Sequence, residues 1–125
     1  MVLVDTSVWI DHLRRGEAGL SELLDEGKVA IHPFVIGELA CGNLKNRGEI
    51  LALLHALPAA SRVEDDELLL FIDRHRLSGL GLGLIDLHLL ASCQLDSFTL
   101  WTHDARLNAA AENLGLAPGR PPVDP

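Results

Sequence analysis

Four carboxylates in this sequence lie at places where an α/β fold builds its functional crevice. They are Asp5, Glu38, Asp86 and Asp104. Asp5 and Asp104 each come just after a short apolar run that is expected to be a strand. Asp86 lies in the first turn of an expected helix, and Glu38 lies one to two turns into another. Ligands of an open parallel sheet bind beyond the carboxyl ends of its strands, so acids at these junctions point toward a common site.

Carboxylates that converge repel one another, which raises their pKa values unless cations neutralise them. Oxygen-only ligands favour Mg²⁺ or Mn²⁺ over zinc, which prefers nitrogen or sulfur. Ions held in this way usually act on phosphate groups, so the expected reaction is hydrolysis of a phosphodiester by an activated water. For any single acid the simpler interpretation is a helix cap, and the spacing alone does not show that the four side chains meet.

Short apolar runs alternate with longer stretches of helical period, which is typical of a parallel sheet covered by helices. The fold class is therefore α/β. Strands are expected at 2–4, 29–31 and 98–102. Helices are expected after an N-cap at Thr6 or Ser7, after Ser21 as far as Gly27, and at 33–40, 49–57, 65–79, 85–93 and 105–114. The Gly-Leu alternation at 79–83 lacks the spacing of a dinucleotide loop and is interpreted as a connector.

The chain has 125 residues, which suits one domain, expected at 1–117 and followed by a proline-rich tail at 118–125 without regular structure. No apolar stretch approaches the roughly 20 residues that cross a bilayer, and no export signal is evident, so we expect a cytoplasmic protein. Cys41 and Cys93 form neither a disulfide framework nor a metal motif. The net charge of −8 argues against bulk electrostatic binding of nucleic acid, which would need a local patch or a metal.

Other chemistry finds little support in the sequence. The histidines form no zinc motif and the serines no nucleophile elbow, although His103 could contact RNA or move a proton. Trp9 and Trp101 are expected in the core. Basic residues that could rim a groove, or serve only as a solvated surface, are Arg14, Arg15, Lys45, Arg47, Arg74 and Arg76.

Two other Mg²⁺-dependent classes of similar size are disfavoured. A receiver domain needs an acidic pair before its first helix and a lysine after a late strand, whereas Lys28 and Lys45 both come early. A haloacid-dehalogenase phosphatase would carry a second Asp two residues after the first, where this chain has Ser7.

Four segments together resemble PIN-domain ribonucleases, and more narrowly the VapC toxins of prokaryotic toxin-antitoxin pairs. They are Asp5-Thr6-Ser7, Gly37-Glu38-Leu39, the helix from Ile85-Asp86 to Ser92, and Thr102-His103-Asp104. The resemblance implies a three-layer α/β/α sandwich and an acidic site for Mg²⁺, or Mn²⁺ as substitute, formed by the four carboxylates, with Thr6, Ser7 and Thr102 as supporting hydroxyls. Leu107 stands where the family often has an aromatic residue.

The resemblance also implies an RNA substrate, arrest of translation, a homodimer, and a VapB-type antitoxin that covers the site. The basic residues would then serve RNA, the dimer or the antitoxin. A PIN-like domain that has lost catalysis and acts only as an interaction scaffold remains the alternative.

Overall fold

Three short strands form one parallel sheet in the computed structural model, which describes residues 1–118. They are β1 (Val2–Val4), β2 (Val29–Ala30) and β3 (Thr99–Trp101), in the order β2-β1-β3. Leu3 pairs with Ala30 on one side and Leu100 on the other. The central strand is buried because its residues are apolar toward both faces, as expected of a sheet covered on both sides.

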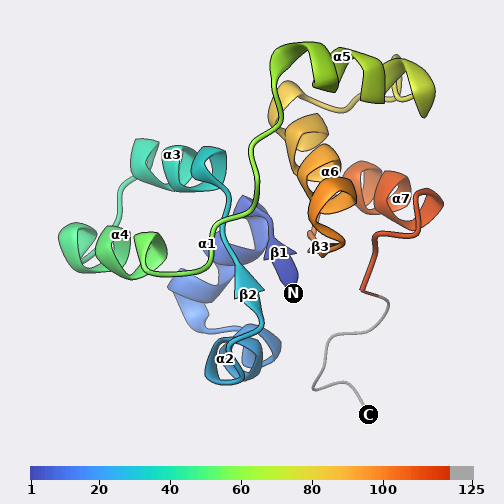
Figure 1. Ribbon diagram of the computed structural model, residues 1–125. Helices are drawn as coiled ribbons and strands as arrows, with labels where there is room; N and C mark the ends of the chain where they lie inside the picture. Colours follow the sequence, from blue (N-terminus) through green and yellow to red (C-terminus); the bar gives the residue numbers. More distant parts are fainter. Residues whose placement is uncertain (119–125) are drawn as a thin grey trace.

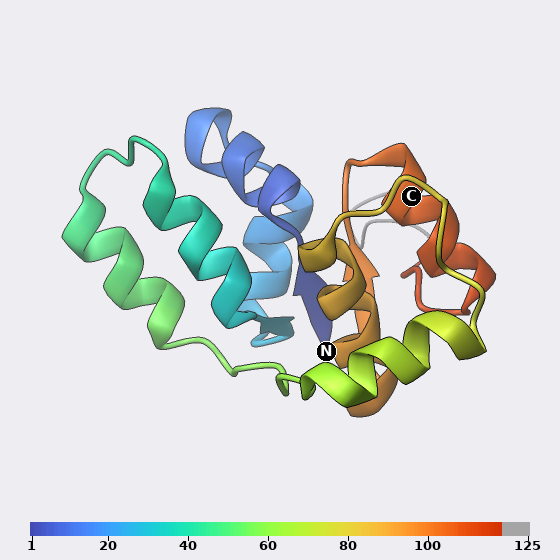
Figure 2. The same ribbon diagram turned by 90° about the horizontal axis from the view of Figure 1, so that it is seen from above.

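The helices belong to two crossover connections, one from β1 to β2 and one from β2 to β3, and the two connections run in opposite directions across the sheet. The first consists of α1 (Thr6–Arg15) and α2 (Ala18–Asp25). The second consists of α3 (Pro33–Cys41), α4 (Arg47–His55), α5 (Asp65–Arg74) and α6 (Leu84–Asp96), and α7 (Ala105–Asn113) follows β3. Right-handed crossovers in opposite directions place helices on opposite faces of a sheet. Figures 1 and 2 accordingly show β1 between α1 and α6, which confirms the predicted α/β sandwich.

Several element ends differ from the predicted ones. Helix α2 begins at Ala18, three residues before Ser21, and β2 ends at Ala30. Ile31 instead forms a bridge with Ala59, a contact between segments far apart in the sequence. Helix α5 ends at Arg74 rather than running to Gly79, because Arg76 adopts a left-handed φ of 55° that no α-helix continues through.

The N-cap of α1 is Asp5, so the prediction of a cap at Thr6 or Ser7 was wrong. Both hydroxyls lie inside the helix and bond to carboxylates, as described below. The tail predicted at 118–125 lies outside the described residues beyond position 118. Among residues 1–118 no helix is both long enough and apolar enough to cross a membrane.

Two buried histidines make the fold sensitive to acid. His32 is fully buried, and its Nδ1 accepts a hydrogen bond from the Phe34 backbone N–H at 3.0 Å, which requires an unprotonated nitrogen. Burial, and then the neighbouring His88, lowers the pKa of His32 to about 4, and burial lowers the pKa of His88 as well. The ring centroids of the two histidines lie 6.4 Å apart.

We therefore expect the free energy of unfolding to fall as pH drops below 6.5, the unfolded pKa, toward about 4. Within that window His32 is protonated in the unfolded chain but not in the folded chain. This difference alone lowers the free energy of unfolding by about 3 kcal/mol. Urea unfolding across the window measures this loss. His32→Asn keeps a capping oxygen without the titration and should flatten the dependence; an unchanged slope in that variant would remove His32 from the explanation.

Candidate active site

Asp5 is the most firmly positioned of the four acids. It follows β1, and its backbone N–H bonds to the Trp101 carbonyl on β3 at 2.9 Å. Its side chain is buried but does not cap α1. Instead Oδ2 accepts hydrogen bonds from Thr102 Oγ1 at 2.7 Å and Ser7 Oγ at 2.9 Å. The helix-cap interpretation is therefore wrong for Asp5, since its carboxylate is held by hydroxyls that gather around it.

The same hydroxyls tie the segment after β3 to the start of α1. Ser7 Oγ accepts from the His103 backbone N–H at 3.0 Å, and Thr102 Oγ1 accepts from the Asp104 backbone N–H at 3.0 Å. Each hydroxyl thus donates to Asp5 and accepts from the later segment. Because a hydroxyl both donates and accepts, Ser and Thr can connect a carboxylate to a backbone amide in this way.

Glu38 reaches the site from α3. Its Oε1 accepts a hydrogen bond from Thr6 Oγ1 at 2.6 Å. Thr6 directly follows Asp5, so this bond fixes the exposed Glu38 side chain beside the buried acid. The contact spans 32 residues of sequence and connects the first turn of α1 to α3.

Asp86 and Asp104 approach Asp5 from α6 and α7. Burial raises the pKa of Asp86, and the negative charges of Asp5 and Asp104 add to that rise, while a hydrogen bond from the Gly83 backbone N–H at 3.0 Å opposes it. Asp104 caps α7, since its Oδ1 accepts from the Leu107 backbone N–H at 3.0 Å. The charges of Asp5 and Asp104 thus reach Asp86, although burial is the larger cause of its raised pKa.

Each of the four acids uses one oxygen in these hydrogen bonds and leaves the other without a partner among residues 1–118. No Lys or Arg within that range pairs with any of them. Anchored carboxylates with one free oxygen each, and no cation to neutralise them, fit a hard divalent ion such as Mg²⁺.

The side chains nevertheless do not form a closed cage. Within residues 1–118, no group of three His, Cys, Asp or Glu side chains is close enough together to hold one ion. The structure thus places Asp5 and Asp104 near enough to Asp86 for their charges to raise its pKa, and it connects Glu38 to α1 through Thr6. A bound ion would have to draw these oxygens closer or share its coordination with water, which Mg²⁺ normally retains.

Sequence reasoning missed one side-chain contact at this site. His103 Nδ1 lies 2.7 Å from Asp11 Oδ2, and Asp11 also pairs with Arg15 at 3.4 Å. The contact fastens the residue between Thr102 and Asp104 to α1. The spacing of Asp11 after Asp5 gave no signal for it, because the partner lies 92 residues away in the sequence.

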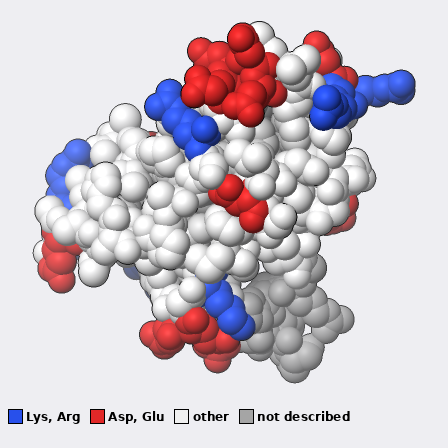
Figure 3. Space-filling model, in the orientation of Figure 1, with Lys and Arg blue, Asp and Glu red and all other residues white. Residues whose placement is uncertain are grey.

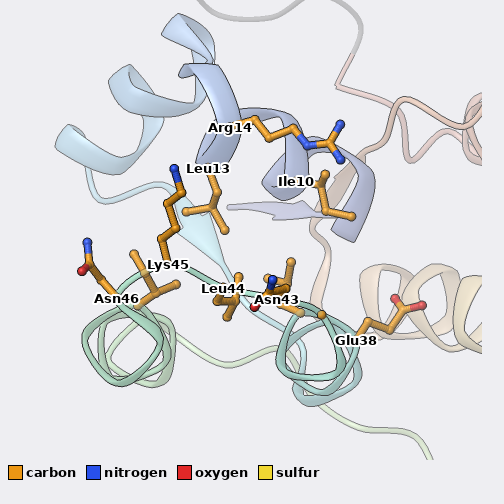
Figure 4. A pocket seen from close by; sticks show the side chains of 11 residues that line it. Ile10, Leu13, Arg14, Glu38, Asn43, Leu44, Lys45 and Asn46 are labelled. Atoms are coloured by element: carbon orange, nitrogen blue, oxygen red, sulfur yellow. The ribbon is translucent and has the colours of Figure 1, made fainter.

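A cavity of about 620 Å³ opens beside Glu38. Figure 4 shows Arg14 reaching from α1, Glu38 from α3, and Lys45 from the connection to α4. The remaining lining is largely apolar, including Ile10, Leu13, Leu44 and Ile50. Two of the predicted rim cations therefore line the same cavity as Glu38. Trp9 and Trp101 are buried, as predicted.

A sequence model described as "PIN domain" matches residues 2–113. The chain belongs to the PIN-domain family. Two curated relatives, both named "Ribonuclease VapC32", come from Mycobacterium tuberculosis strains CDC 1551 / Oshkosh and ATCC 25618 / H37Rv. Each is 48% identical to this PIN domain over 118 residues, which covers 94% of this chain and 95% of the relative.

The crystal structure of PAE2754 from Pyrobaculum aerophilum is similar to this PIN domain, with a TM-score of 0.63 over 90% of both chains. At 18% identity this likeness shows the fold alone. The resemblance to VapC-type PIN domains is confirmed by the family match and the VapC32 relatives together. The parallel sheet and its covering helices agree with the solved PIN-like structure.

Proposed function

We propose that this protein is a divalent-metal-dependent endoribonuclease, the toxin of a VapBC-type pair, that cleaves RNA and thereby inhibits translation. The observation that carries the proposal is the buried Asp5 carboxylate, which two hydroxyls hold by one oxygen while the other has no hydrogen-bond partner among residues 1–118. A carboxylate whose role is to cap a helix would accept a hydrogen bond from the helix backbone, which the Asp5 side chain does not, although Asp5 is the N-cap residue of α1. The VapC32 relatives, named as ribonucleases, support the same activity.

Asp5 and Asp86 would hold Mg²⁺, or Mn²⁺ in its place, most directly, with Glu38 and Asp104 completing the site or positioning water. When bound there, the ion supplies positive charge that lowers the pKa of the attacking water and neutralises charge that develops on the phosphate. The chain itself contributes by orienting the carboxylates. Ser7 and Thr102 fix the rotamer of Asp5, and Thr6 does the same for Glu38.

The acidic surface bears on the choice of substrate. Figure 3 shows acidic side chains over α5 and near α2, with basic side chains scattered between them. Such a surface attracts few phosphates over long range, so recognition has to come from the shape of the RNA, for example a tRNA or rRNA loop. Cleavage in the cytoplasm by a homodimer, held in check by a VapB-type antitoxin, completes the proposal.

The chemistry of the cut ends tests the mechanism. Water activated at the acidic site attacks the phosphodiester in line, so the products should carry 5′-phosphate and 3′-hydroxyl ends. Digestion of a bacterial RNA mixture with Mg²⁺, followed by ligation and phosphatase tests of the fragments, measures this outcome. Products with 2′,3′-cyclic phosphates would contradict it, because the RNA 2′-hydroxyl would then be the nucleophile.

The alternative is a catalytically silent interaction scaffold, which predicts a different result in the same RNA digestion. A scaffold would leave RNA intact at every metal concentration while still binding the antitoxin. Retention of all four carboxylates, each anchored by a hydrogen bond, favours the enzyme.

A further inference from the structure

One cation follows the last of the four acids closely in the sequence. Arg106 is the second residue of α7 and comes two positions after Asp104. Its side chain is exposed, and within residues 1–118 it makes no hydrogen bond or ion pair. Although it comes two residues after Asp104, it pairs with none of the four acids among residues 1–118.

The guanidinium lies instead across Gly81, in the connector that leads to α6. A β-carbon added at Gly81 would come within 2.5 Å of Arg106 Nη1 and 3.2 Å of its Cζ. Any other residue at this position would therefore push the guanidinium away. Two residues further on, the Gly83 backbone N–H holds Asp86. Arg106 thus bridges the junction that carries Asp104 and the loop that carries Asp86.

A phosphodiester approaching this site meets strong repulsion, since four carboxylates face it and the whole chain has a net charge of −8. An ion at the carboxylates relieves the repulsion for the reacting phosphate only. A neighbouring phosphate of the same strand needs a cation of its own, and a free guanidinium with paired N–H donors suits phosphate oxygens well. Arg14 and Lys45 line the cavity beside Glu38, whereas Arg106 lies against the connector that leads to Asp86.

We propose that Arg106 binds a phosphate of the RNA strand adjacent to the one that is cleaved, and that Gly81 lacks a side chain so that the guanidinium can lie there. This assignment rests on the proposed ribonuclease function. It makes Arg106 a substrate-positioning residue, and it places the strand across the site from the Glu38 cavity toward the connector at 79–83.

The test measures binding of a fluorescein-labelled single-stranded RNA of mixed sequence by anisotropy, in EDTA so that no cleavage occurs, over a range of salt concentrations. We expect Arg106→Ala to weaken binding about tenfold and to reduce the slope of log affinity against log salt by about 0.7, the value for one lost phosphate contact on a single strand. Arg106→Lys should restore most of the slope.

Two matched controls separate this contact from general effects. Lys28→Ala removes one positive charge at the opposite end of the sheet and should leave the slope unchanged. Gly79 has a φ of 76° with open space around it, and Gly81 has a φ of 77° against Arg106. The Gly79→Ala and Gly81→Ala variants should therefore lose similar amounts of melting temperature, while only Gly81→Ala should weaken RNA binding.

Arg106→Ala with the wild-type affinity and slope, in a wild type that binds and cleaves RNA, would overturn the assignment and leave the proposed function standing. A wild type that neither binds nor cleaves RNA would overturn both. Equal loss of binding in Gly79→Ala and Gly81→Ala would also count against the assignment, because backbone strain alone would then explain it.

Discussion

Replacing Asp5 by Asn should lower RNA cleavage about a thousandfold or more while the protein stays folded. The substitution removes the negative charge that the ion needs. A thousandfold fall in rate corresponds to the loss of several kcal/mol of transition-state stabilisation. The amide oxygen can still accept from Ser7 and Thr102, so the local fold should persist. In metal-free buffer the free energy of unfolding should rise, because the change relieves repulsion with Asp86 and Asp104.

Initial rates of RNA cleavage at a saturating Mg²⁺ concentration measure this effect, with circular dichroism and urea unfolding as checks on the fold. Asp25→Asn provides a matched control, since it removes the same charge from the exposed end of α2. A folded Asp5→Asn variant that cleaves RNA at the wild-type rate would exclude Asp5 from the mechanism.

Thr102→Val should weaken Mg²⁺ binding and RNA cleavage by roughly ten- to a hundredfold, although Thr102 itself is not expected to carry the reaction. Valine has nearly the same shape but loses the donor to Asp5 and the acceptor for the Asp104 backbone N–H. Asp5 would then keep only Ser7 as a donor and would sample other rotamers. The loss of stability should be about 2 kcal/mol, because two hydrogen bonds of a buried hydroxyl are removed.

The matched control for this prediction is Thr99→Val, at the other end of β3. Thr99 makes no side-chain hydrogen bond among residues 1–118, so its replacement should leave Mg²⁺ affinity unchanged. Calorimetric Mg²⁺ titrations of both variants give the comparison. Equal affinities for Thr102→Val and the wild type would show that the hydroxyl does not position Asp5.

Much of the fold followed from local pattern, because the buried strands of a parallel sheet are apolar toward both faces. The run at Val2–Val4 and the acid after it were enough to predict a buried strand there and the position of Asp5 at its end, but the place of that strand at the centre of the sheet came from the structure. The ends of other elements depended on partners distant in the sequence. Ile31, predicted in the second strand, bonds to the Pro58 carbonyl at 2.9 Å and bridges Ala59, so its geometry is set by a segment about 28 residues later.

The site was predictable to a similar degree. The rule that strand ends face a common crevice predicts that Asp5 and Asp104 lie near each other, and in the structure the charges of both reach Asp86. That rule does not say which oxygen of each carboxylate is held and which is free. The contact of Arg106 with Gly81 could not be predicted from the sequence either, because the path of the 79–83 connector depends on where α5 ends and α6 begins.

The prediction of a connector at 79–83 is confirmed, and its glycines show why. Gly79 and Gly81 both adopt positive φ, which side chains tolerate poorly, so the segment turns instead of extending either helix. Sequence reasoning recognised the glycines as breakers but could not find the arginine that lies against one of them.

The central claim is that the carboxylates around Asp5 form one divalent-metal site, and calorimetry tests it most directly. Mg²⁺ and Mn²⁺ would be titrated into the wild type and into an Asp5→Asn, Asp86→Asn double variant, with circular dichroism to confirm that both are folded. Binding by the wild type that disappears in the folded double variant is the expected result. Equal binding in both proteins, or binding in neither, would mean that these acids hold no ion and serve only in the hydrogen bonds that connect the segments, and the scaffold alternative would then take the place of the enzyme.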